Sequence, residues 1–279
     1  MLKVRVISAV VGIVLLVAVI LLGPEVFGVA MSIMALIGLY EFYNSVSSAG
    51  FRPIRTVGYI SCIPLFLIGI GAGFSWVGSI FTYSEPIKVF FLGLFIVVLV
   101  LFSLIVFQHK RFNIVDIALT LFGPTYVVFL FLFVILTRNL ENGMLFILLI
   151  FIGAWGTDTF AYFTGMFLGR RKVLPVISPK KTLEGTIGGV VGTILATVAY
   201  GVLIINKTYN IPFYHFILIG ALNGAVSQIG DWGASSIKRH VNIKDYGKIM
   251  PGHGGVLDRF DSILFIAPIV YFYYIFVLF

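Results

Sequence analysis

The chain has 279 residues, of which 60% are hydrophobic and only 11% charged, and its net charge is +8. This is more apolar side chain than a soluble core can bury, so the composition excludes a soluble globular protein and predicts an integral membrane protein. The single cysteine, Cys62, excludes an internal disulfide and a cysteine-rich zinc site.

Apolar stretches of membrane-spanning length recur along the whole chain and predict an all-α, polytopic fold with about nine transmembrane helices, each of about 20 residues. We expect the first stretch to be a retained helix and not a cleaved signal peptide, because Gly23-Pro24-Glu25 is not a small-residue cleavage site. The third is long and broken by glycine, so two short helices are the alternative. In chain order the predicted spans are Val4–Leu22, Val26–Val46, Val57–Phe81, Val89–Phe107, Ile114–Leu136, Met144–Leu168, Gly185–Ile205, Phe213–Ile237 and Phe260–Phe279.

The distribution of lysine and arginine orients these spans. With the N-terminus inside and the C-terminus outside, only Lys88, Arg138 and Lys207 fall in outside segments, and the other 16 of the 19 basic residues fall inside. This is the asymmetry that the positive-inside rule requires. The two longest inside loops, residues 169–184 and 238–259, both lie in the C-terminal half. We therefore divide the chain into an N-terminal membrane scaffold, residues 1–142, and a C-terminal catalytic half, residues 143–279.

Polar residues inside the predicted spans are costly and therefore informative. Asp158 lies deep in the sixth span, where it either bonds to a neighbouring helix or borders a polar site. In the eighth span Asn223, Ser227, Asp231 and Ser235 recur every four residues and line one helical face. That face ends at two basic residues and favours a polar cavity that opens to the inside.

The last inside loop contains PGHGG and leads into the ninth span. Asp258 and Asp261 share one face at the start of that span, near the expected inner end of the eighth helix. Carboxylates brought together in this way suit Mg²⁺, which often completes its shell with substrate phosphates. Glycines allow backbone N–H groups to turn toward an anion. The alternative is that the glycines are ordinary loop residues and that Asp258 is only a helix cap.

The other long inside loop contains SPKKTLEG, Ser178 to Gly185. Thr182 is a good N-cap for the seventh helix, and two lysines precede it. These lysines either anchor the loop at the membrane surface or clamp phosphates. Together the two loops predict phosphoryl or nucleotidyl transfer at the inner membrane surface, because that chemistry needs mainly positioning and charge neutralisation. We expect no nucleic-acid partner.

The stretch SSIKRHVNIKDYGKIMPGHGGVLDRFD, Ser235 to Asp261, resembles the signature of the phosphatidate cytidylyltransferases, and SPKKTLEG resembles the second hallmark of that family. One departure is Met250, where Leu, Ile or Phe is expected. The resemblance is specific over about the last 125 residues. It implies transfer of a cytidylyl group from CTP to phosphatidic acid, which gives CDP-diacylglycerol and pyrophosphate for phospholipid biosynthesis.

The resemblance also implies roles for individual residues. Asp231 and Asp258 would hold Mg²⁺, Asp261 would assist them, and Lys238 and Arg239 would complete the catalytic group. The polar face of the eighth span could hold a second, monovalent cation such as K⁺. A homodimer in the cell inner membrane with a cytoplasmic active site is also implied. The expected substrate-binding residues are Ser178, Lys180, Lys181, Thr182, Glu184, Lys244, His253, Gly254, Gly255 and Arg259.

Two other functions are compatible with the same features. A CTP-dependent kinase of a lipid alcohol such as a polyprenol could use similar metal and phosphate contacts. An ion-coupled transporter would use Asp158 and Asp231 along a path across the membrane. The sequence disfavours the transporter, because the acids gather toward one face of the membrane.

Overall fold

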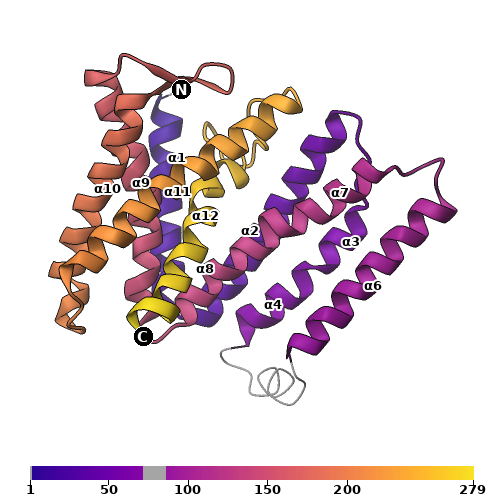
Figure 1. Cartoon of the computed structure of the whole chain (residues 1–279), viewed down its shortest axis with the longest axis horizontal. Helices are drawn as coiled ribbons and strands as arrows, with labels where there is room; N and C mark the ends of the chain where they lie inside the picture. The colour runs from indigo at the N-terminus through magenta and orange to yellow at the C-terminus, as the bar shows by residue number, and fades with distance from the viewer. Residues whose placement is uncertain (1, 72–85) are drawn as a thin grey trace. The chain divides into compact units, whose positions relative to one another are not determined.

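The computed structural model describes residues 2–71 and 86–279 and separates into two compact units (Figure 1). The first unit contains Met1–Ile135 and Tyr246–Val256, and the second contains Leu136–Asp245 and Leu257–Phe279. The last part of the third predicted span lies outside the described residues. The functional division at residue 142 remains a prediction.

Helices α1 to α8 build the first unit, and α8 continues into the second. Pro24 opens α2, where its fixed φ suits the first helical position and its missing N–H costs nothing. Pro124 lies in the middle of the fifth predicted span, where it opens a π-helical turn between two α-helices. The bounds are α1 (Leu2–Leu21), α2 (Pro24–Ser48), α3 (Arg55–Ile60), α4 (Cys62–Ile70), α6 (Pro86–Phe107), α7 (Ile114–Gly123), η1 (Pro124–Val128) and α8 (Phe129–Asn139).

Helix α2 is the centre of the first unit and packs against α1, α3, α4, α7 and η1. It approaches α4 closely, since a Cβ at Gly28 would lie within 2.2 Å of the Gly69 carbonyl oxygen. Tyr43 is fully buried and donates a hydrogen bond of 2.8 Å to the Thr120 carbonyl. In its described part, the third predicted span is divided into two short helices, α3 and α4, at Ser61, three residues before Pro64.

In the second unit α10 packs against α9 and α11, and α12 packs against α11 and α9 (Figure 1). Small residues allow the close approach of α9 and α10, because a Cβ at Gly192 would lie 2.1 Å from the Phe160 ring. The bounds are α9 (Gly143–Leu168), β1 (Lys172–Leu174), β2 (Ser178–Thr182), α10 (Leu183–Leu203), η2 (Ile205–Lys207), α11 (Phe213–His240), α12 (Leu257–Tyr273) and η3 (Tyr274–Leu278).

The all-α prediction needs one correction. Strands β1 and β2 form an antiparallel hairpin in the first long basic loop, with Lys172 opposite Thr182 and Leu174 opposite Ser178. Helix α10 begins directly after β2, so the hairpin is attached to the start of this helix. Elsewhere in the described ranges the structure is helical apart from turns and one isolated bridge.

Within the described ranges, five helical segments are long and apolar enough to cross a membrane, and the chain is an integral membrane protein. They are Pro24–Ser48, Ile114–Asn139, Gly143–Leu168, Leu183–Lys207 and Leu257–Leu278. Helix α11 has 28 residues but is not among these five apolar segments, and its polar face accounts for its lower hydropathy. The nine spans and their orientation remain predictions.

Candidate active site

An enclosed charged contact of the second unit joins α11 to α12. The Lys238 ammonium lies 2.7 Å from a carboxylate oxygen of Asp258, and the two side chains are only 10% and 1% exposed. Asp258 lies in the first turn of α12, where the positive end of the helix dipole also favours a carboxylate. Asp258 therefore does more than cap the helix, because its carboxylate also forms an ion pair with Lys238.

A second ion pair joins the hairpin to α11, between Lys181 on β2 and Asp231. These side chains are more open, with 29% and 22% exposed. The Lys181 ammonium also lies 5.9 Å from the centre of the Trp232 ring, a cation–π distance. Asp231 and Lys238 are seven residues apart on one helix, so both ion pairs lie along one face of α11.

Further charged groups surround Lys181. Burial lowers the pKa of this lysine, whereas the negative charges of Asp158 and Asp261 raise it and the positive charge of Lys238 lowers it. The charges of Asp158 on α9 and Asp261 on α12 thus both act on the pKa of Lys181. Four elements of the second unit, β2, α9, α11 and α12, contribute charges to one neighbourhood.

The polar face of α11 is open only in part. Asn223 and Ser227 are completely buried, and Ser262 of α12 donates a hydrogen bond of 3.1 Å to the Ser227 carbonyl. Asn223 reaches the Leu149 carbonyl of α9 at 3.4 Å. The deeper half of the face is therefore packed between helices, and the accessible part begins near Asp231.

The predicted residues of the first basic loop divide into structural and exposed groups. Thr182 is the N-cap of α10, as predicted, and accepts a hydrogen bond of 3.2 Å from the Gly185 N–H. Glu184 accepts hydrogen bonds from the N–H groups of Arg170 and Arg171, at 2.9 and 3.2 Å. Glu184 therefore orders the start of the hairpin, and its role in substrate binding remains a prediction.

Other predicted residues lie at the surface. The Arg239 guanidinium donates to the Ile243 carbonyl at 3.1 Å and to the Ile177 carbonyl at 3.4 Å, and so connects the hairpin with the end of α11. Lys180, Lys244 and Arg259 are exposed and take no part in the two ion pairs, and Ser178 is half-buried where β2 begins.

The glycine loop, residues Tyr246–Val256, belongs to the first unit. Gly252 and Gly254 have φ of 77° and 88°, left-handed values that favour glycine, and the Met250 N–H donates to the Gly254 carbonyl at 2.9 Å. The His253 ring lies 2.8 Å from the Ser8 hydroxyl of α1. The curled backbone predicted for this loop is present.

The predicted metal ligands, Asp231 and Asp258, lie beside lysines. Within residues 2–71 and 86–279, no three His, Cys, Asp or Glu side chains form a group that could hold a metal ion. The prediction needs only Asp231 and Asp258 from the protein, with the remaining ligands from water and substrate phosphates. In the structure each of these acids has a lysine partner. The metal remains a prediction.

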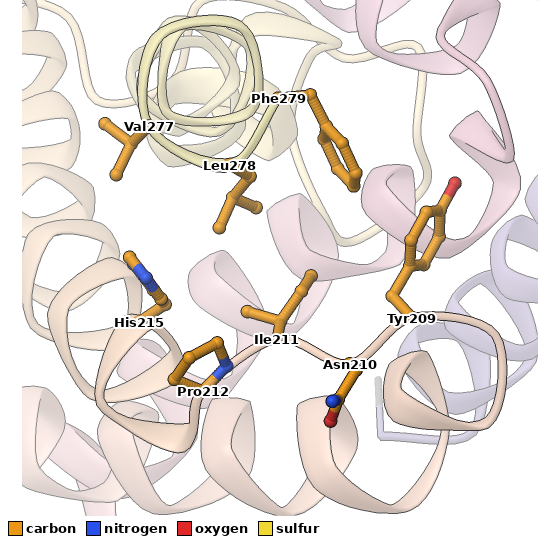
Figure 2. Close-up of a pocket in the computed structure, with 8 residues that line it drawn as sticks. All are labelled: Tyr209, Asn210, Ile211, Pro212, His215, Val277, Leu278 and Phe279. Atoms are coloured by element: carbon orange, nitrogen blue, oxygen red, sulfur yellow. The ribbon is translucent and has the colours of Figure 1, made fainter.

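A cavity of about 180 Å³ lies at the other end of α11 (Figure 2). Residues before and within the start of α11, including His215, line one side, and the end of the chain, including Phe279, lines the other. No predicted site residue lines this cavity.

Sequence reasoning missed one acid. Glu41 lies in the second predicted span and is only 2% exposed, and its carboxylate contacts the glycine loop. The rule that singled out Asp158, a carboxylate inside an apolar span, applies equally to Glu41 and could have found it.

The lysine partners of Asp231 and Asp258 had no sequence signal, because Lys181 lies 50 residues from Asp231 and Lys238 lies 20 residues from Asp258.

Apolar helices with a charged cluster of paired acids and lysines define a polytopic membrane protein with a candidate phosphate-binding site. Comparison with known proteins gives the family. The model of the "Cytidylyltransferase family" matches residues 3–277, so the chain belongs to this family. Curated relatives named phosphatidate cytidylyltransferase include those of Staphylococcus haemolyticus, at 33% identity, and Staphylococcus saprophyticus and Staphylococcus aureus, at 34% each. Each match covers 96% of this chain and 97% of the relative.

Proposed function

We propose that this protein transfers the cytidylyl group of CTP to phosphatidic acid and releases pyrophosphate. The observation that carries the proposal is the pair of contacts Lys238–Asp258 and Lys181–Asp231 on one face of α11, in a chain that matches phosphatidate cytidylyltransferases over 96% of its length. Lysines able to bind phosphates and carboxylates able to bind a cation lie side by side there.

In the proposed reaction a phosphate oxygen of phosphatidic acid attacks the α-phosphorus of CTP. A new P–O bond forms, the bond from the α-phosphorus to the oxygen bridging to the β-phosphate breaks, and pyrophosphate leaves with that electron pair. No general base is required, because phosphatidic acid is already ionised at neutral pH. Lys181 and Lys238 would hold phosphate oxygens and balance the charge that develops on them.

We propose Mg²⁺ as the cation of this reaction. Asp231 and Asp258 offer hard carboxylate oxygens of the kind that Mg²⁺ prefers, and the Asp231 side chain is 22% exposed. These two residues would hold the ion, and it would neutralise negative charge on the reacting phosphates. Asp261 would act beside them through its charge on Lys181. A second, monovalent cation near Asn223 and Ser227 is part of the same proposal.

The labelled nucleotide test separates the proposed function from its rivals. Purified protein in detergent is incubated with phosphatidic acid and CTP labelled in either the α- or the γ-phosphate. We expect the α-label, and not the γ-label, in the lipid product. A lipid product carrying the γ-label would show a kinase, and no labelled lipid from phosphatidic acid would refute the proposal.

The proposed orientation has nine spans and places the hairpin at the cytoplasmic face of an inner membrane. Cys62 is buried, so single cysteines introduced at the exposed positions Lys172 and Lys207 can be labelled against a low background. We expect an impermeant thiol reagent to label Lys207→Cys in intact cells and Lys172→Cys only after lysis. The reverse pattern would invert the topology. The homodimer is tested by the mass of the purified protein in detergent.

A further inference from the structure

Glu41 is a buried acid for which the proposed chemistry has no use. It lies on α2 in the first unit, at 2% exposure, about five residues before the predicted inner end of its span. A buried carboxylate is costly unless other groups satisfy it. Its carboxylate oxygen Oε1 accepts a hydrogen bond of 3.0 Å from the backbone N–H of Val256, 215 residues later in the chain.

The glycine loop is shaped around this carboxylate. A Cβ at Gly255 would have the Glu41 carboxylate as its three nearest atoms, at 2.4 to 2.5 Å. A Cβ at Gly247 would lie 2.2 Å from Oε1. Neither glycine has a positive φ, so the conformation of the backbone does not require glycine at these two positions. Glycine is required there because the Glu41 carboxylate leaves no space for a Cβ.

The same loop has a second attachment to the N-terminal helices. The Ser8 hydroxyl of α1 donates to the Pro251 carbonyl at 3.1 Å and contacts the His253 ring at 2.8 Å. Ser8 thus holds the turn of the loop, while Glu41 holds its end, next to the first residue of α12. Gly252 and Gly254 bend the chain between these two points.

We infer that Glu41 is a positioning residue for CTP: its carboxylate fixes the glycine loop in the conformation that receives the phosphates of the nucleotide. This inference rests on the proposed function. Glu41 touches neither substrate, and it acts through the N–H of Val256 and the backbone at Gly247 and Gly255. Within the first unit, α2 thus supports the glycine loop through Glu41.

The first test combines kinetics with hydrogen exchange. Glu41→Ala should raise KM for CTP and lower kcat/KM for CTP by about 100-fold, as expected for a misplaced binding group, with a much smaller change in KM for phosphatidic acid. Amide exchange in the segment 250–256 should become faster. Glu41→Gln keeps an acceptor oxygen and should retain more activity than Glu41→Ala. Glu25→Ala, an acid at the start of the same helix, is the matched control and should behave as wild type.

A double-mutant cycle tests the contact from the side of the loop. Gly255→Ala places a methyl group against the Glu41 carboxylate and should also raise KM for CTP and speed exchange. Because both changes disrupt one contact, Glu41→Ala combined with Gly255→Ala should cost little more than Gly255→Ala alone. If Glu41→Ala does not fold, Gly255→Ala and Glu41→Gln still carry the test, and wild-type KM and exchange in both would overturn the inference.

The outcomes distinguish this inference from the proposed function. A wild-type enzyme that transfers no cytidylyl label would refute the function. An active wild-type enzyme in which Glu41→Ala behaves like Glu25→Ala would refute only the role of Glu41. Losses that multiply in the double variant would also refute it, because they would show that Glu41 and Gly255 act independently.

Discussion

Replacing Lys238 with methionine tests whether the contact between α11 and α12 is a buried ion pair. The change leaves the Asp258 carboxylate, 1% exposed, without its ammonium partner at 2.7 Å. Breaking a buried pair from one side costs about 3–5 kcal/mol, because the remaining buried charge loses its counter-ion. An exposed pair would be worth about 0–1 kcal/mol. At 10% exposure for Lys238, we expect the larger loss.

The free energy of unfolding can be measured by titrating the detergent-solubilised protein with SDS and following helicity by circular dichroism. Lys238→Met combined with Asp258→Leu removes both charges and should recover most of the lost stability, although the double variant should stay inactive. Lys207→Met, at an exposed lysine of η2, is the control. A loss below about 1 kcal/mol for Lys238→Met would refute the reasoning, because the pair would then behave as an exposed one.

Four further predictions follow from the site and its surroundings. Asp231→Asn should lower turnover by at least about 100-fold in folded protein, whereas the exposed Glu141→Gln should not, and an active Asp231→Asn would remove this acid from the site. EDTA should abolish turnover and added Mg²⁺ should restore it; turnover that resists EDTA would exclude the metal. Thr182→Ala should lower stability by about 1 kcal/mol through loss of the N-cap, as a lower thermal midpoint would show, and Thr182→Ser should not. Gly254→Ala forces alanine to a φ of 88°, at about 1–2 kcal/mol, and should raise KM for CTP, while Gly93→Ala, a helical position with open space around it, should leave KM unchanged.

Features of the site that depend on neighbouring residues in the chain, such as a helix cap or a turn, could be predicted from the sequence. Thr182 has the side chain of an N-cap and precedes a helix, and it is one. The glycines of PGHGG suggested a curled backbone, and Gly252 and Gly254 have the left-handed φ values that such a backbone needs. Hydropathy located the helices, since burial of apolar side chains in lipid depends on composition over about 20 residues.

Features that depend on distant partners were not predictable in the same way. The hairpin of β1 and β2 has strands of three and five residues, too short and too polar for an alternating pattern to be visible. The sequence placed Asp231 and Asp258 near one another but gave no sign that each has its own lysine. The polar residues of α11 predict a cavity along this face, yet helix packing buries Asn223 and Ser227 completely.

The contact of Glu41 with the glycine loop limits which amino-acid substitutions this chain can accept. The Glu41 carboxylate can approach the loop only because residues 247 and 255 have no side chain. More than 200 positions separate Glu41 from these two glycines. A chimera that takes its first helices from another protein must bring a side chain of the same length and acceptor chemistry, or the signature motif will lose its support while remaining intact in sequence. The effect of a substitution at Glu41 is therefore expected to depend on which residues occupy positions 247 and 255.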